Sequence, residues 1–435
     1  MLCSMSVDSM SLKANKDVCA LSLGVELNED GSIIDSSLVV TPSIVCVDYR
    51  LTYEEADEML EEGIAFSEEW QLGALLTAAT KRREFRMSKG SSEAFVPNQI
   101  PKYSISLYNK GNSDEVEISV NVEVSHNAGK NQSSVDIFGS DSRSSLYDQE
   151  PVSASNTLVT EMMILAGEAI GKWKLRIEKR EQQSSKDEQP LISNSLRLPF
   201  RTQPKPDFDT RAREKAVFMD LLAYNIGDGY CHAWYARRFL SPVKVQEEAK
   251  PHFGLGLDCY VQWSSPIRRF QDLQVHAAVK RYLRREKVNE LISAGQAIPE
   301  QLTYNDLGIG PPIHSEGGKY ILPADSSEVD ADIDYGERAG LLGVSRTVQF
   351  SAQRYWMLEH IRREREKDAS KMYEALVLGC IDPARKIYVV FIYELGFETK
   401  YLNPVGSLQT GTALKLHVAS VTPRTGQIKW VRAQV

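Results

Sequence analysis

The pattern of apolar residues changes near residue 374, and this change constrains the fold more than any other feature of the chain. Five short strand patterns follow one another from there to the end of the chain. They are ALVLGCI, KIYVVFIYEL, ETKYL, TALKLHVASV and QIKWVRAQV, separated by turn residues such as Asp382-Pro383 and Pro423 to Gly426. Short strands in such close succession are typical of a small closed barrel of the OB type. The sequence therefore predicts a small barrel over residues 371–435.

Residues 1–370 mix strand and helix patterns and are expected to form one α+β domain, a mixed sheet with helices. Apolar residues alternate with polar ones from Leu21 to Leu27, and the Asn-Glu-Asp-Gly sequence that follows supplies a turn, so a β-hairpin is predicted there. Residues 117–124 alternate strictly, as a strand with one solvated face does. Apolar residues at helical spacing over residues 72–79 and 157–173 predict two helices with buried stripes.

Two long segments of this domain lack such periodicity. Residues 178–210 are polar and Pro-rich, so we expect a surface connection. Residues 287–345 are rich in Gly, Pro and acidic residues and are expected to form an insertion that decorates the domain.

Composition excludes several classes of protein. The 435 residues are 42% hydrophobic and 25% charged, which are ordinary globular values and exclude a disordered or collagenous chain. No uninterrupted apolar stretch reaches about 18 residues, so no membrane span and no membrane partner are expected. The six cysteines form no CxxC pair, which argues against a zinc site and a disulfide framework.

Charge is distributed unevenly along the chain. The formal net charge is −8, yet residues 374–435 of the predicted barrel carry seven Lys and Arg residues against four acidic ones, a net charge of +3. Its basic residues, among them Lys400, Arg424 and Lys429, are interleaved with aromatic residues. This composition is typical of barrels that bind single-stranded nucleic acid by stacking and phosphate contacts. The alternative is that the aromatic residues form the barrel core.

Residues 264–276, SSPIRRFQDLQVH, contain the strongest candidate site. The Ser-Pro pair predicts a helix start, because serine is a good N-cap and proline fits the first helical position. Arg268 and Arg269 then lie at an end that attracts anions such as phosphate. Arg268, Asp272 and His276 share one helical face, so Asp272 is expected to orient Arg268. The alternative is a solvated helix end held by salt bridges.

Two further residues are candidates. Glu161 lies at the apolar stripe of the helix predicted over residues 157–173, and a buried carboxylate is unfavourable unless it is paired. It is either a site residue or a boundary residue that reaches solvent or binds an arginine. Tyr53 begins an acidic helical segment, which Thr52 is expected to cap.

Together these segments resemble the ribonuclease II family, the exoribonucleases with an RNB domain. The resemblance is carried by RLTYEE at 50–55, TEMMILAGEA at 160–169, LPFR at 198–201 and above all SSPIRRFQDLQVH at 264–276. The sequence around HFGLGLDCYVQW is most similar to the plant organellar branch of the family. The resemblance implies 3′-to-5′ hydrolysis of single-stranded RNA to nucleoside 5′-monophosphates, with Mg²⁺ as cofactor, in RNA processing and decay.

The resemblance also implies roles for individual residues. Arg268 matches the arginine that contacts the phosphate at the scissile end, and Tyr53 and Glu161 match positions near the terminal nucleotides; these three are the expected catalytic residues. Arg269, Asp272 and His276 match motif positions that are expected to support RNA binding, and the composition of the barrel adds Lys400, Arg424 and Lys429 to the expected RNA-binding residues.

One part of the family pattern does not occur in the chain. The family holds its metal with aspartates of a D-D-A-type motif, and the sequence has no such string. Residues 330–334, DADID, depart from the EF-hand pattern and predict a solvated loop, so no metal ligand is assigned. We expect either an N-terminally incomplete sequence of an active exoribonuclease or a truncated chain that binds RNA without cleaving it. A protein-interaction scaffold is the third alternative.

The N-terminal segment has no recognisable targeting signal. Residues 1–17 lack both an apolar core and the Arg-rich character of a transit peptide. Only the resemblance to the plant organellar branch implies a location, which is the chloroplast or the mitochondrion.

Overall fold

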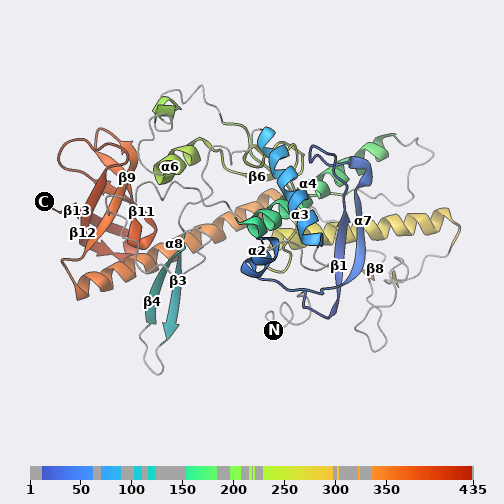
Figure 1. Ribbon diagram of the computed structural model, residues 1–435, viewed down its shortest axis with the longest axis horizontal. Coiled ribbons are helices and arrows are strands. Elements are labelled where there is room, and N and C mark those ends of the chain that lie inside the picture. The colour runs from blue at the N-terminus through green and yellow to red at the C-terminus, as the bar shows by residue number, and fades with distance from the viewer. Residues whose placement is uncertain are drawn as a thin grey trace. The chain divides into compact units, whose positions relative to one another are not determined.

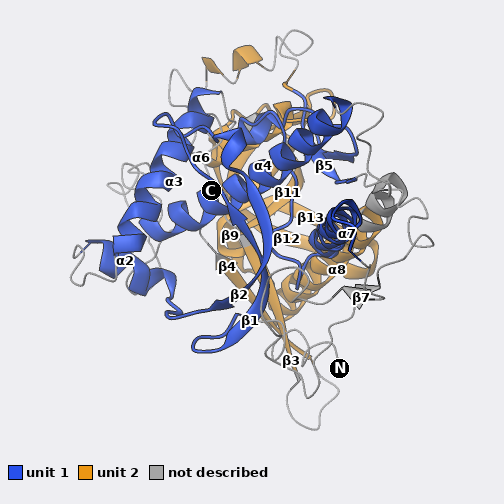
Figure 2. Cartoon of the chain, turned by 90° about the vertical axis from the view of Figure 1, so that its right-hand side faces the viewer, with its two compact units in different colours: residues 1–91, 153–204, 242–337 blue, residues 92–152, 205–241, 338–435 orange. Residues whose placement is uncertain are grey.

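The computed structural model describes residues 12–61, 70–89, 102–109, 116–123, 153–183, 196–206, 215–217, 219–220, 229–296, 301–302, 322–323 and 335–433. The chain divides into two compact units (Figure 2). Unit 1 consists of residues 1–91, 153–204 and 242–337, and unit 2 of residues 92–152, 205–241 and 338–435. The units are defined by packing, so the expected domain boundary near residue 370 stays a prediction.

Unit 1 contains most of the helices. Its elements are β1 (Asp17–Gly24), β2 (Val39–Cys46), α2 (Tyr53–Glu61), α3 (Trp70–Ser88), α4 (Ala154–Gln183), β5 (Phe200–Thr202), β6 (Lys244–Gln246), α7 (Phe270–Ser293), β7 (Gln301–Leu302) and β8 (Leu322–Pro323), with 3-10 helices η2 (Asp35–Ser37) and η5 (Phe253–Leu255). β1 pairs with β2 in antiparallel fashion, which confirms the predicted hairpin. β5 pairs with β6, and β7 with β8.

Helix α4 is the centre of unit 1. Leu165, Ala169, Ile170 and Trp173 of this helix are buried together with residues of β2, β5 and α7 in one hydrophobic core. The ring of Trp173 meets the ring of Tyr282 of α7 edge to face, with centroids 5.4 Å apart. α4 therefore serves as the surface on which the other segments of the unit are positioned.

Two predictions about unit 1 are wrong in part. On α3, Leu75 is exposed, and Ala79 is followed on the buried face by Arg82 and Arg86 instead of apolar residues. The expected surface connection over residues 178–210 contains the end of α4 and a buried segment that includes β5. Its Leu and Phe residues at 196, 198 and 200 are apolar enough to join the core although the segment as a whole is polar.

Several sequence features fall largely outside the described residues. Residues 287–293, the start of the expected insertion, continue α7, and α8 begins before the end of the expected insertion. Most of the remaining insertion, including residues 330–334, lies outside the described part of the chain.

Unit 2 contains the predicted five strands. They are β9 (Met372–Asp382), β10 (Ile387–Ile392), β11 (Phe397–Leu402), β12 (Ala413–Thr422) and β13 (Gln427–Arg432), in the antiparallel order β11-β10-β9-β12-β13. Figure 1 draws these strands in the colours of the C-terminal end of the chain. The indole Nε1 of Trp430 on β13 donates to Thr399 Oγ1 on β11 at 3.4 Å, so side chains of the two edge strands meet. This arrangement is consistent with an OB-type barrel and confirms the predicted fold class.

Two further parts of unit 2 pack on this sheet. The last turns of α8 (Tyr335–Lys367) place Met357, Leu358 and Ile361 in the same core, and the hairpin of β3 (Lys102–Asn109) and β4 (Val116–Glu123) packs against it. Helix α6 (Gly229–Phe239) covers another part of the sheet through Trp234. No helix within the described residues is long and apolar enough to cross a lipid bilayer.

The contact between α6 and β9 yields a test of unit 2. A Cβ on Gly379 of β9 would lie 2.4 Å from Cζ3 of the buried Trp234 ring. We expect Gly379→Ala to lower the free energy of unfolding by about 1 to 3 kcal/mol, because an overpacked core strains its neighbours. Urea denaturation measures this change. Gly343→Ala is the matched control: a Cβ there meets nothing within 4 Å, and alanine favours the helix.

Candidate functional site

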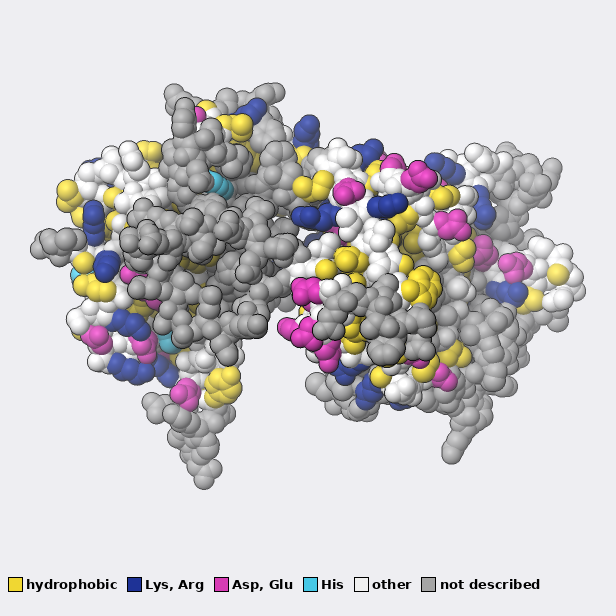
Figure 3. All heavy atoms as spheres, in the orientation of Figure 1, with side chains coloured by type: hydrophobic (Ala, Val, Ile, Leu, Met, Phe, Trp, Pro, Cys, Tyr) yellow, Lys and Arg dark blue, Asp and Glu magenta, His cyan; other side chains and the backbone are white. Residues whose placement is uncertain are grey.

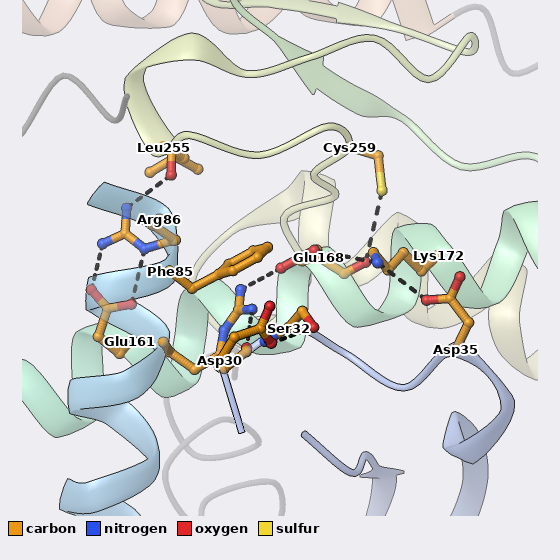
Figure 4. A network of polar contacts seen from close by, with 12 residues as sticks. Asp30, Ser32, Asp35, Phe85, Arg86, Glu161, Glu168, Lys172, Leu255 and Cys259 are labelled. Atoms are coloured by element: carbon orange, nitrogen blue, oxygen red, sulfur yellow. Dashed lines mark hydrogen bonds and ion pairs between the residues drawn. The ribbon is translucent and has the colours of Figure 1, made fainter. Parts of the chain in front are cut away.

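Two arginines of α3, Arg82 and Arg86, are fully buried and bind two glutamates of α4. Figure 4 labels Arg86 and both glutamates, Glu161 and Glu168. The Nε atom of Arg86 donates to Glu161 Oε2 at 2.9 Å, and its Nη2 atom donates to Oε1 of the same carboxylate. One turn away on α3, Arg82 Nη2 donates to Glu168 Oε2. Because an unpaired charge is strongly unfavourable in a protein interior, each arginine requires its glutamate in this position.

Each arginine also holds a third segment of the chain. The Nη1 atom of Arg86 donates to the carbonyl of Leu255 in η5 at 2.9 Å. The Nη1 atom of Arg82 donates to the carbonyl of Gly31, in the loop between β1 and β2, at 2.7 Å. Gly31 has a positive φ of 83°, and a Cβ there would lie 2.5 Å from the carbonyl oxygen of Lys81, so this loop requires glycine. The two ion pairs thus fix the hairpin and η5 against α3.

The segment that leads to the SSPIRRF motif lies directly on α4. A Cβ on Gly167 of α4 would be 2.2 Å from Cε2 of Tyr260, so the glycine permits a very close approach. The indole Nε1 of Trp263 donates to the carbonyl of Ala166 at 2.9 Å. Residues that follow Trp263 therefore leave α4 at a defined point.

The predicted helix start at Ser265 is wrong. Residues 265–268 form a turn, and α7 begins at Phe270 with Arg269 as its N-cap residue. The backbone amide of Ser265 donates to Asp272 Oδ2 at 2.9 Å, while its carbonyl accepts from the amide of Arg269 at 3.0 Å. The buried carboxylate of Asp272 therefore stabilises a turn at the residues where the local Ser-Pro sequence favours the start of a helix.

Asp272 pairs with a different arginine from the one predicted. Its Oδ2 atom lies 2.7 Å from Nη2 of Arg269, and Arg268 precedes the helix, so the predicted shared face with Asp272 does not form. The side chain of Arg268 is exposed, and within the described part of the chain it has neither an ion pair nor a hydrogen bond. The turn therefore presents one neutralised arginine and one free guanidinium group.

His276, further along α7, binds the segment that leads into the turn at residues 265–268. Its Nε2 atom donates to the carbonyl of Trp263 at 2.9 Å, and the two rings lie 5.3 Å apart. Burial lowers the pKa of the imidazole below its usual value, which favours the neutral ring. The structure thus brings Arg269, Asp272 and His276 together as the support of the turn.

The two other expected catalytic residues lie in different surroundings. Glu161 is buried, and both of its carboxylate oxygens accept hydrogen bonds from Arg86. Tyr53 is exposed at the first position of α2. The predicted cap is confirmed: the amide of Glu55 donates to Thr52 Oγ1 at 3.2 Å, and the amide of Thr52 donates to Glu55 Oε2 at 2.7 Å. Catalytic roles for Glu161 and Tyr53 stay predictions.

The barrel presents cations but few aromatic rings. Lys400, Arg424 and Lys429 are exposed, and no ion pair to them occurs among the residues that the structure describes. Most of the aromatic residues predicted as a stacking platform are buried, so the core alternative is correct; these are Tyr388, Phe391, Phe397, Tyr401 and Trp430. On the face shown in Figure 3, basic and acidic side chains of the described residues are interspersed.

The described residues do not fit a bound Mg²⁺ ion. No three His, Cys, Asp or Glu side chains of this part of the chain gather as metal ligands would. The buried carboxylates of Glu161, Glu168 and Asp272 are each paired with a cation from the chain itself. We therefore derive no catalytic step through a metal.

Sequence reasoning missed the pairing of α3 with α4. Arg82 and Arg86 continue the helical spacing of the stripe that ends in Ala79, and Glu161 and Glu168 lie two turns apart on α4. The available signal was a pair of arginines in the apolar stripe of one helix and a pair of glutamates in the apolar stripe of the other. Because arginine is rarely fully buried unless it is paired, the burial of Arg82 and Arg86 could be predicted only if α3 was known to pack against α4.

The Arg86–Glu161 pair can be tested by a double-mutant cycle. We expect Arg86→Met to lower the free energy of unfolding by about 3 to 5 kcal/mol, because it leaves a buried carboxylate without its partner. Adding Glu161→Met should restore most of this loss, since both charges are then absent. Urea unfolding of the wild type, the two single variants and the double variant checks this; additive losses in the double variant would contradict the pairing.

The comparisons with known proteins agree with the motifs. Residues 1–285 match the RNB domain family. The chain is 27% identical over 423 residues to an uncharacterized ribonuclease of Synechocystis sp., covering 97% of this chain and 47% of that protein. It is 26% identical over 427 residues to the chloroplastic/mitochondrial ribonuclease II of Arabidopsis thaliana, covering 97% of this chain and 40% of that protein. The chain thus spans less than half the length of these two relatives.

Solved structures show the same fold. The apo form of Mycoplasma genitalium RNase R matches with a TM-score of 0.60 at 12% identity, covering 99% of this chain and 60% of that one. The Dss1 exoribonuclease of Candida glabrata, an active-site mutant, matches with a TM-score of 0.59 at 17% identity, covering 97% of this chain and 44% of that one. The resemblance drawn from the motifs is confirmed, and because the RNB match spans 285 of the 435 residues, the chain belongs to the RNB-domain ribonuclease family.

Proposed function

We propose that the protein functions in the 3′-to-5′ exonucleolytic hydrolysis of single-stranded RNA to nucleoside 5′-monophosphates, in RNA processing and decay, and that this chain contributes the RNA-binding part of that activity. The observation that carries this proposal is the free guanidinium group of Arg268 on the turn at residues 265–268. Its match to the phosphate-contacting arginine of the family supports a contact with the RNA backbone. The similarity to a chloroplastic/mitochondrial relative supports an organellar location, the chloroplast or the mitochondrion.

The chemistry of the turn suits a phosphate. A guanidinium group presents its donors in a planar fork that matches phosphate oxygens. Arg268 has no competing carboxylate among the described residues, because the nearby Asp272 is occupied by Arg269 and by the amide of Ser265. Since Asp272 also fixes the turn, the position of Arg268 is defined before RNA binds, which reduces the entropy lost on binding.

The barrel would contribute a second, less specific set of contacts to the RNA backbone. Lys400, Arg424 and Lys429 are exposed cations without ion pairs among the described residues, and such groups attract a phosphate backbone. They would hold RNA without reading its sequence. Because the aromatic residues of the barrel are mostly core, we assign the barrel an electrostatic role and no stacking role.

A second candidate function is RNA binding without hydrolysis by this chain. It is favoured by the absence of a D-D-A string from the sequence and by the absence of a metal-ligand cluster from the described residues. Metal-assisted hydrolysis of a phosphodiester needs carboxylates that hold the ion. Mg²⁺ therefore belongs to the proposal only for an enzyme in which those carboxylates are present.

Binding of a fluorescent oligoadenylate tests the proposed contact between Arg268 and the RNA backbone. We expect Arg268→Ala to weaken binding about tenfold or more at low salt, because a hydrogen-bonded charge pair is lost. The slope of log affinity against log salt should fall by about 0.7, the value for one contact to a single strand. Arg346→Ala, which removes an exposed arginine of α8, is the matched control. Unchanged affinity in Arg268→Ala would refute the phosphate assignment.

Hydrolysis separates the two candidate functions. For the 435-residue chain we expect oligoadenylate binding that salt weakens, without Mg²⁺-dependent release of adenosine 5′-monophosphate. Chromatography of the nucleotides after incubation with and without Mg²⁺ measures this. Robust release of monophosphates by this chain would show that it contains a complete catalytic site.

A further inference from the structure

Three large apolar side chains are exposed within seven residues around the free arginine. The exposed fractions are 51% for Ile267, 56% for Phe270 and 45% for Leu273. Phe270 and Leu273 are three residues apart on the first turn of α7 and therefore lie on one side of the helix. A single exposed apolar residue is ordinary, but a group of this kind on a surface commonly marks a binding site.

The ring of Phe270 is attached to a firmly held part of the backbone. It is the first residue of α7, and the turn before it is closed by the buried carboxylate of Asp272. Further along α7, Val275 and Val279 are fully buried in the core of unit 1. An aromatic ring with such support loses little freedom when a flat ligand stacks on it.

The charge beside the ring indicates which partner fits. Arg268 is two residues from Phe270, so their Cα atoms lie at most about 7 Å apart, and both side chains can reach one ligand. Arg269 is neutralised by Asp272, which leaves Arg268 as the charge of the turn. A nucleotide combines the two complementary features, a flat base and an anionic phosphate. An apolar protein segment would use the three apolar side chains and leave the guanidinium group without a partner.

We propose that Phe270 is a base-stacking residue, which carries one base of the RNA strand whose phosphate Arg268 binds, with Ile267 and Leu273 flanking the ring. This inference rests on the proposed function and adds a residue that selects single strands. A base in a duplex is already stacked and paired, so it must leave the duplex before it can lie on Phe270.

The test compares two probes and three substitutions of Phe270 in the 435-residue chain. The probes are an oligoadenylate and a ribose-phosphate oligomer of the same length without bases. Phe270→Ala removes the ring, Phe270→Leu keeps an apolar side chain without an aromatic face, and Phe270→Tyr keeps the ring. Tyr108→Ala, which removes a tyrosine of β3 that is 55% exposed, is the matched control. Thermal unfolding checks that all variants fold.

We expect Phe270→Ala and Phe270→Leu to weaken oligoadenylate binding about tenfold, the loss of one stacked base, while Phe270→Tyr and Tyr108→Ala bind within about twofold of the wild type. Binding of the oligomer without bases should be equal in all of them. Wild-type affinity in Phe270→Leu, or an equal loss on both probes, would overturn stacking. Unchanged oligoadenylate binding in Phe270→Ala would also overturn it, and would favour a protein partner for the apolar group.

Failure of this inference and failure of the proposed function give different results. If Arg268→Ala weakens binding to both probes while Phe270→Ala changes neither, only the stacking role is overturned. If neither substitution has an effect, or if the wild type binds no oligoadenylate at low salt, the RNA site at this turn is overturned as well.

Discussion

The register between α3 and α4 depends on two buried ion pairs, Arg82 with Glu168 and Arg86 with Glu161. Buried ion pairs contribute little net stability compared with apolar packing, but breaking one leaves a charge without compensation. A shift of α3 by one turn would break both pairs, so a single alignment of the two helices satisfies all four side chains. The same arginines bind the carbonyls of Gly31 and Leu255, which extends this alignment to the hairpin and to η5.

The exposed site follows from a second set of buried groups. The chain after η5 crosses α4 where Gly167 leaves room for Tyr260, and Trp263 then binds a carbonyl of α4. Asp272 accepts a hydrogen bond from the amide of Ser265 and forms an ion pair with Arg269, so one of the two arginines of the motif is already paired. The guanidinium group of Arg268 remains exposed, and it has no ion-pair partner among the residues that the structure describes. The residues that the motif shares with its family thus divide into buried groups that shape the turn and an exposed arginine that can meet a ligand.

The sequence predicted the parts of the fold that depend on local patterns. Short strand patterns separated by turn residues identified all five strands of the barrel, and Thr52 caps α2 as expected. Predictions failed where distant residues decide the outcome. The Ser-Pro pair at residues 265 and 266 favours a helix start, but the carboxylate of Asp272, seven residues further on, binds the Ser265 amide and delays the helix. Burial of Arg82 was likewise unpredictable from its own helix, because its partner comes from α4.

If Arg268 binds the RNA backbone as proposed, RNA contacts the turn at residues 265–268, and the barrel is a secondary contact. Photocrosslinking measures this most directly, with an oligoribonucleotide that carries 4-thiouridine at its 3′ end and with mass spectrometry to locate the adducts. We expect adducts on residues 264–273, and a loss of these adducts in Arg268→Ala. Adducts confined to residues 371–435, with none on the turn, would contradict it.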